Sequence, residues 1–294
     1  MRKCFKCGSE LPDYASFCPK CGSGVKKSVL SMPSVALVLS ILCVFLYFAI
    51  QYIISLVLAG VYTLTGANEN SVLNRFSLAD ISTAISIFSV ITATAILKLV
   101  FGRVKGCERQ SVRPRRFRLR HVPLFAVLGA SLQYVILFLT YLMPWPKEWL
   151  ITHSENMTSA TSGSLVLVIL SVSVLTAIAE ETVFRSIIVG ILGRAFSPML
   201  CLIFSAVIFG AAHMSPIAFF YATILGLILG AIYINYRTIL PSVIVHMFFN
   251  LAAILLPAGK APLLDIALLL IATAFTMLSM YLVFAPAQHT DNNQ

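Results

Sequence analysis

Long apolar stretches alternate with short polar segments along most of this chain. Eight apolar stretches follow one another, at about residues 33–62, 78–101, 121–143, 164–189, 197–213, 217–235, 239–257 and 262–285. A helix needs about 20 predominantly apolar residues to cross the hydrocarbon core of a bilayer. The pattern therefore predicts an all-α polytopic membrane protein with about eight transmembrane helices.

The polar segments between these stretches predict loops. Residues 146–163 are rich in Thr, Ser, Asn and Gly and are interpreted as an external loop. At its start, Pro144-Trp145-Pro146 and Trp149 predict a turn anchored by aromatic rings at the membrane interface. Asp80 and Asp265 lie near the ends of apolar stretches, where we expect water to solvate them.

Composition and charge support the membrane assignment. Hydrophobic residues make up 59% of the chain and charged residues 11%, against about 25% charged residues in soluble domains. The net charge of +10 comes largely from Lys26, Lys27 and a basic run at 103–120 between the second and third stretches. Cytoplasmic loops carry such positive charge, so both termini are predicted in the cytoplasm. The run is expected to contact anionic lipid rather than nucleic acid.

The first 25 residues are cysteine-rich. Two Cys-x-x-Cys pairs, each followed by glycine, are formed by Cys4, Cys7, Cys18 and Cys21. Four sulfurs in this arrangement suit a tetrahedral structural zinc, whose binding would supply the folding free energy of so short a segment. Two disulfides or a disordered tail are the alternatives. The segment resembles the zinc-ribbon modules of bacterial membrane proteins, and it can bind a protein partner. Reduced thiols again indicate the cytosol.

Charged residues interrupt the fourth apolar stretch. Glu180, Glu181 and Arg185 lie within six residues of one another. A charge in lipid costs a few kcal/mol, so such groups usually face a protein interior or a watery cavity. Glu181 and Arg185 have the i,i+4 spacing of a helical ion pair. Glu180 is rotated about 100° from Glu181 and is therefore free to face another partner.

Further polar residues follow on later stretches. His213 comes four residues after Phe209, and Asn250 comes four residues after His246, so each pair shares a helix face. Together with Glu180, these groups can activate water and stabilise an oxyanion. Two histidines and a glutamate can also hold a catalytic zinc. The alternatives are a helix-packing salt bridge, histidines that only join helices, and an Asn250 bonded to a backbone carbonyl.

Three motifs in this order resemble the CPBP family of CAAX-prenyl-protease and bacteriocin-processing (Abi) intramembrane endopeptidases. They are Glu-Glu-x-x-x-Arg at 180–185, Phe-x-x-x-His at 209–213 and His-x-x-x-Asn at 246–250. The resemblance covers about residues 120–285 and implies an eight-helix protease with a cavity open to the cytoplasmic leaflet. It assigns water activation to Glu180 and His213, and oxyanion stabilisation to His246 and Asn250. Whether a catalytic metal takes part is left open.

These observations give a domain plan. It comprises a zinc ribbon (1–25), a linker (26–32), two helices with a basic loop (33–119), a protease core (120–285) and a polar tail (286–294). The predicted location is the cytoplasmic membrane of a bacterium, and the predicted substrate is a membrane-associated protein or peptide. A non-catalytic scaffold that uses the ribbon to bind a partner is the alternative. A proton-coupled transporter is a further one, since Glu and His chains also relay protons.

The depth of His213 conflicts with this plan. If the stretch 197–213 crosses the membrane from the cytoplasmic side, His213 lies near its outer end. Helical rise then places it roughly 10–15 Å from the level of Glu180. The motifs predict that the two side chains share a site, and this interpretation takes precedence over the span boundaries.

Overall fold

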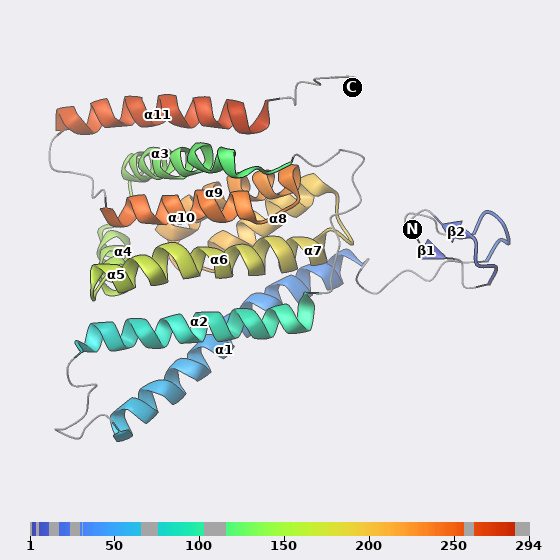
Figure 1. The fold of residues 1–294 in the computed structure, drawn as a ribbon, viewed down its shortest axis with the longest axis horizontal. Helices are drawn as coiled ribbons and strands as arrows, with labels where there is room; N and C mark the ends of the chain where they lie inside the picture. The colour runs from blue at the N-terminus through green and yellow to red at the C-terminus, as the bar shows by residue number, and fades with distance from the viewer. Residues whose placement is uncertain are drawn as a thin grey trace.

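Long helices lie side by side through most of the chain (Figure 1). The structure is a computed structural model that describes residues 2–3, 6–11, 18–23, 30, 32–65, 76–102, 116–255 and 262–285. The main helices are α1 (Pro33–Thr65), α2 (Leu78–Phe101), α3 (Val122–Tyr141), α4 (Lys147–Ala160), α8 (Pro198–Ala211), α9 (Pro216–Tyr236), α10 (Leu240–Leu255) and α11 (Pro262–Phe284). A short 3-10 turn, η4 (Leu119–His121), precedes α3.

One further helix runs without a break from Leu165 to Leu192. It is divided into α5 (Leu165–Val168), η5 (Ile169–Leu175), α6 (Thr176–Glu181), η6 (Thr182–Ile188) and α7 (Val189–Leu192). The segments η5 and η6 are π-helical. A π-helical turn is wider than an α-helical turn and occurs frequently at functional sites. The two π-helical segments flank α6, which carries Glu180 and Glu181.

The predicted membrane architecture is confirmed. Six helices of the described chain are long and apolar enough to cross a membrane, and α8 and α10 are shorter apolar helices of 14 and 16 residues. At 1.5 Å per residue these two are about 21 and 24 Å long, less than the ~30 Å hydrocarbon core. Large apolar side chains such as Phe45, Leu99 and Met277 are exposed on the outer surface, as expected for a surface that faces lipid.

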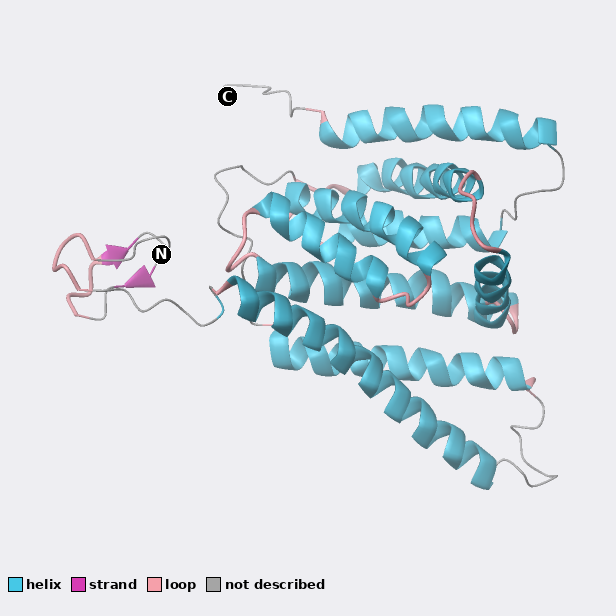
Figure 2. Cartoon of the chain, turned by 180° about the vertical axis from the view of Figure 1, so that it is seen from behind, coloured by secondary structure: helices cyan, strands magenta, loops and turns pink. Residues whose placement is uncertain are grey.

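The helix 165–192 lies in the middle of the bundle, between α2 and α10 in the view of Figure 1. α10 packs against α3 and η5, and α11 packs against α3 at the edge. α8 and α9 pack against each other and lie in front when the bundle is seen from behind (Figure 2). The core is made of side chains from several helices, including Phe125, Phe184 and Phe209. This arrangement surrounds α6 with protein on several sides.

The expected external loop at 146–163 is wrong for most of its length, because residues 147–160 form α4. The polar composition excluded a membrane span but did not exclude a surface helix. Pro146 immediately precedes the first turn of α4. This position suits proline, which has no backbone N–H, because an N–H at the start of a helix has no intrahelical partner. The Trp145 ring packs on Trp149 and on Phe220, with centroids 6.1 and 5.9 Å away. These aromatic contacts hold the start of α4 against α9.

Asp80 is not simply solvated, contrary to the expectation from sequence. Its Oδ1 accepts a hydrogen bond of 2.7 Å from the backbone N–H of Ser164, and its Oδ2 accepts one of 2.7 Å from the Ser77 hydroxyl. Ser77 in turn caps α2 by accepting from the N–H of Asp80. One carboxylate therefore ties the start of α2 to the start of the helix 165–192. The side chain of Asp265, the other residue of this expectation, lies outside the described residues.

A close approach of α3 and α10 depends on Gly129. A Cβ atom at this position would overlap the carbonyl oxygen of Val245. We expect Gly129→Ala to lower the free energy of unfolding by about 1–3 kcal/mol, the usual cost of overpacking. The matched control is Gly60→Ala on α1, where an added Cβ meets nothing within 4 Å. Thermal unfolding in detergent compares the two, and equal midpoints would contradict this account of the helix contact.

Candidate functional site

The charges of the central helix form a buried ion pair. Arg185 Nη1 lies 3.1 Å from Glu181 Oε1, and the two side chains are 1% and 0% exposed. Arg185 Nη2 also donates to the carbonyl oxygen of Gly226 on α9, at 3.2 Å. The i,i+4 pair expected from the spacing is therefore present. Because both charges are excluded from solvent, each depends on its partner for its stability.

His246 on α10 lies between the two glutamates. Its Nδ1 is 3.1 Å from Glu181 Oε1, and its Nε2 is 3.7 Å from Glu180 Oε2. The carboxylate of Glu181 can only accept, so Nδ1 carries a proton and Nε2 faces Glu180. The Glu180 side chain keeps 19% of its surface exposed, whereas that of His246 keeps 4%. Glu180 is therefore the carboxylate of this group that is open to a small molecule such as water.

Phe209 on α8 contacts the other polar groups through its ring. The guanidinium carbon of Arg185 lies 4.6 Å from the ring centroid. The imidazoles of His213 and His246 approach the same ring edge-on, with centroid distances of 5.0 and 5.9 Å. All three sequence motifs therefore meet at one phenyl ring.

His213 follows the end of α8 and is fixed by a local hydrogen bond. Its Nδ1 lies 2.9 Å from the carbonyl oxygen of Phe209. A carbonyl oxygen only accepts, so Nδ1 carries the proton and Nε2 is left as an acceptor. α8 ends at Ala211, so it is shorter than the hydrocarbon core of a bilayer. The Phe209 ring contacts both the imidazole of His213 and the guanidinium of Arg185, so one phenyl ring separates His213 from the polar network of the central helix.

Asn250 joins α10 to the π-helical segment η5. Its Nδ2 donates to the carbonyl oxygen of Val172 at 3.0 Å, and the Ser173 hydroxyl donates to the carbonyl oxygen of Met247 at 2.8 Å. The contact between Asn250 and a backbone carbonyl, one of the alternatives from sequence, is therefore present. It uses one of the two amide N–H groups of Asn250. No other hydrogen bond of this amide occurs within the described residues.

The grouping differs in one respect from the expectation. Glu180, Glu181, Arg185 and His246 form one polar network, but no hydrogen bond or ion pair joins Glu180 to His213 within the described chain. Three contributors were missed from sequence, namely Ser173, Gly226 and Tyr221, whose ring stands edge-on to the His213 imidazole. A hydroxyl in an apolar stretch marks Ser173 and Tyr221, and the Gly226/Gly230 spacing marks a close helix contact. These signals are too common to identify a site by themselves.

The membrane helices do not provide a compact metal site. No three ligand atoms of His, Cys, Asp or Glu lie within 4.8 Å of one another in the described helices. Nδ1 of each histidine is bonded, to Glu181 or to the carbonyl oxygen of Phe209. Such bonds orient an imidazole and leave its Nε2 available to a ligand.

The N-terminal segment does contain a cluster suited to a metal. Strand β1 (Arg2–Lys3) pairs antiparallel with β2 (Glu10–Leu11). The sulfurs of Cys7, Cys18 and Cys21 lie within 4.8 Å of one another, while Cys4 lies outside the described residues. Gly8 and Gly22 adopt positive φ angles of 70° and 67° after Cys7 and Cys21, a conformation that glycine adopts at little cost. The segment therefore fits a structural metal, which would fix the fold of the ribbon when bound.

The nearby Ser9 hydroxyl supports thiolate ligation. Ser9 Oγ lies 3.2 Å from Cys18 Sγ, and this hydrogen bond is the main cause that lowers the pKa of the Cys18 thiol. We expect the purified protein to contain about one zinc per chain, and Cys18→Ser to lose most of it. Elemental analysis measures the ratio, with Cys201→Ser on α8 as the control because Cys201 is buried far along the chain. Equal zinc content in both variants would contradict ligation by Cys18.

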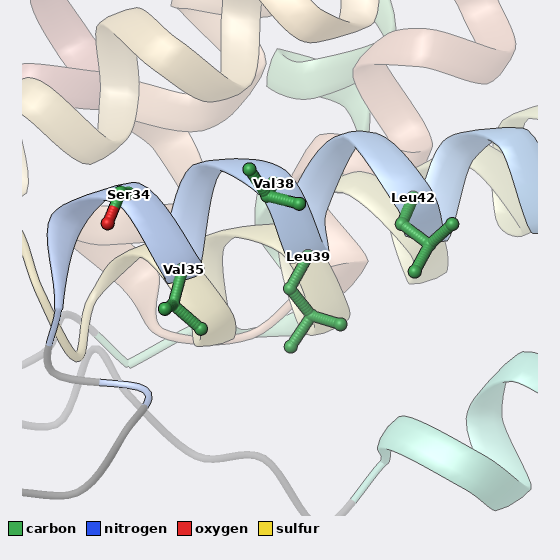
Figure 3. Close-up of a pocket in the computed structure, with 5 residues that line it drawn as sticks. All are labelled: Ser34, Val35, Val38, Leu39 and Leu42. Carbon is green, nitrogen blue, oxygen red and sulfur yellow. The ribbon is translucent and has the colours of Figure 1, made fainter.

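A groove elsewhere on the surface does not belong to this site. It has a volume of about 290 Å³ and is lined by Ser34, Val35, Val38, Leu39 and Leu42 (Figure 3). All five residues lie on α1, and none is ionisable. The groove offers no group for acid–base chemistry.

The fold and the site define a class: a multi-pass membrane protein that holds two carboxylates, a guanidinium and an imidazole in a buried network between its helices. Residues 162–252 match the family described as type II CAAX prenyl endopeptidase Rce1-like, and residues 3–25 match the zinc-ribbon domain. No curated protein and no solved structure matches the chain. The matches confirm the predicted resemblance: residues 162–252 are of the CAAX-protease type and residues 3–25 are of the zinc-ribbon type, and the protease-family match indicates an intramembrane protease.

Proposed function

We propose that the protein hydrolyses a peptide bond in a membrane-associated protein or peptide, with Glu180 as the base that activates water. The observation that carries the proposal is the position of Glu180. It is the more exposed carboxylate of the pair, and its Oε2 lies 3.7 Å from His246 Nε2. That separation is longer than a direct hydrogen bond, and a water molecule is a common bridge across such a gap.

In the proposed reaction, Glu180 takes a proton from water while the water oxygen adds to the scissile carbonyl carbon. The Nε2 of His213 accepts the second water proton as a hydrogen bond, because its Nδ1–H is engaged by Phe209. The carbonyl oxygen becomes an oxyanion. The proton on Glu180 then passes to the amide nitrogen as the C–N bond breaks, which releases an amine and a carboxylic acid.

His246 and the second amide N–H of Asn250 stabilise the oxyanion in this proposal. His246 keeps Nδ1–H on Glu181, so it donates from Nε2 only as an imidazolium. The charges support that form: Arg185 and an imidazolium balance Glu180 and Glu181, and the network is then neutral. A neutral buried network avoids the cost of an unpaired charge. Glu181 and Arg185 act through His246 and are positioning residues.

Location and partners are part of the same proposal. The described ends that carry Arg118, Arg194 and Arg237 belong to α3, α7 and α9 at one end of the bundle, the end at which α1 begins (Figure 1). The positive-inside rule supports a cytoplasmic position for this end and for both termini. The ribbon would then lie in the cytosol of a bacterial cell, where it can bind a partner protein.

The test is a search for new protein termini in membranes. Membranes that contain the wild-type protein are compared with membranes that contain Glu180→Gln, and peptide termini are mapped by mass spectrometry. We expect at least one membrane-associated product to be present only with the wild type. A set of products that is unchanged by Glu180→Gln would favour the non-catalytic scaffold instead.

A further inference from the structure

Tyr221 on α9 lies beside the proposed site, and the mechanism above does not use it. Its ring stands edge-on to the imidazole of His213, with a centroid distance of 6.4 Å. On its other side, the imidazole of His153 on α4 packs edge-on at 5.8 Å. Two histidines, one on α4 and one just after the end of α8, therefore flank this ring.

The hydroxyl of Tyr221 has no hydrogen-bond partner in the part of the chain that the structure describes. No hydrogen bond to it occurs among the described residues, and the side chain is only partly buried. A buried tyrosine hydroxyl usually finds a partner. By contrast, the hydroxyl of Tyr236 on the same helix donates to the carbonyl oxygen of Val283 at 3.4 Å. Tyr221 is thus a donor available for a ligand.

The two groups that the proposed reaction places beside the attacking water are both hydrogen-bond acceptors. The Glu180 carboxylate accepts, and His213 Nε2 accepts because Nδ1–H is bonded to Phe209. These two groups account for both water protons. One lone pair of the water oxygen attacks the carbonyl carbon, and the other lone pair needs a donor.

We propose that Tyr221 is a further catalytic residue, whose hydroxyl donates a hydrogen bond to the oxygen that enters from water. Negative charge develops on this oxygen as Glu180 takes its proton. The hydrogen bond therefore strengthens as the transition state is approached, which is the condition for a gain in rate rather than in binding. Tyr221 keeps its proton throughout, so the balance of atoms in the hydrolysis is unchanged. This inference rests on the proposed function.

The test is Tyr221→Phe, which removes the hydroxyl and keeps the ring between the two histidines. The control is Tyr236→Phe, the same change about 22 Å along α9. The probe is an internally quenched peptide that ends in a cysteine, two aliphatic residues and a final residue, used in farnesylated and unmodified forms. We expect Tyr221→Phe to lower kcat about 10²-fold, the lower range for loss of one oxyanion donor, with KM nearly unchanged. Tyr236→Phe should keep the kcat of the wild type.

The outcomes separate the inference from the proposed function. If the wild type cleaves either peptide and Tyr221→Phe retains its kcat, Tyr221 is only a packing residue and the inference is wrong. A rise in KM with unchanged kcat would assign Tyr221 to substrate binding and also contradict it. If the wild type cleaves neither peptide and produces no new membrane termini, the proposed function fails and the inference fails with it.

Discussion

Glu180→Gln is expected to slow peptide hydrolysis by about 10²–10⁴-fold, the range for loss of a positioned general base. Glutamine has nearly the same shape as glutamate but cannot take a proton from water at neutral pH. Glu180 is 19% exposed, and its shortest ion-pair contact among the described residues is the 3.7 Å approach to His246. The fold should therefore tolerate the change. The measurement is kcat/KM with purified protein and the quenched peptides, or with a substrate identified in membranes.

The control for this prediction is Glu155→Gln. Glu155 lies on α4 and is exposed, so the same change in charge should leave kcat/KM and the unfolding midpoint as in the wild type. A Glu180→Gln protein that retains more than about a tenth of the wild-type kcat/KM would remove Glu180 from the role of base. A large fall in its unfolding midpoint would show a structural effect instead.

Arg185→Met is expected to lower the free energy of unfolding by about 3–5 kcal/mol, the cost of leaving one member of a buried ion pair without its partner. Glu181 is 0% exposed, and Arg185 is the permanent positive charge beside it, at 3.1 Å. Methionine fills similar space but offers no charge. The change also removes the hydrogen bond to Gly226 and the contact with the Phe209 ring. SDS titration in mixed micelles measures the unfolding free energy.

Two further variants show whether the charge is responsible. Arg118→Met is the control, because Arg118 is exposed before α3, and its effect should lie within about 0.5 kcal/mol. The double variant Glu181→Gln with Arg185→Met should recover part of the loss, since the unpaired carboxylate is then gone. An additive double variant would show that Arg185 acts through packing and not through its charge.

Much of the fold follows from local patterns in the sequence. The boundaries of α1, α2 and α9 agree within a few residues with the apolar stretches at 33–62, 78–101 and 217–235. The agreement is close because a bilayer requires an uninterrupted apolar length from each crossing helix. α4 was missed for the complementary reason. α4 does not have the apolar length that a bilayer requires of a crossing helix, and its polar residues fit a surface helix as well as a loop.

The candidate site was predicted in part. Glu181 and Arg185 could be paired from sequence because i,i+4 neighbours meet on any helix. The contact of His246 with both glutamates joins residues more than 60 positions apart, and no helical spacing predicts it. The resemblance assigns water activation to Glu180 and His213, and this stays a prediction; the structure adds His246 as the imidazole next to both carboxylates. The packing of α10 against α6 brings His246 next to the two glutamates.

The sequence by itself determined that this protein crosses a membrane, that it carries a ribbon of paired cysteines, and that three charges in one span need partners. Each of these conclusions depends on residues close together in the chain and on the cost of placing charge in lipid. Only the tertiary structure decided which nitrogen of His246 faces which glutamate, that Phe209 is the common contact, and that Tyr221 lies beside His213. Those contacts arise from the packing of separate helices. The position and rotation of each helix against its neighbours are set by close-packed side chains and not by any local pattern.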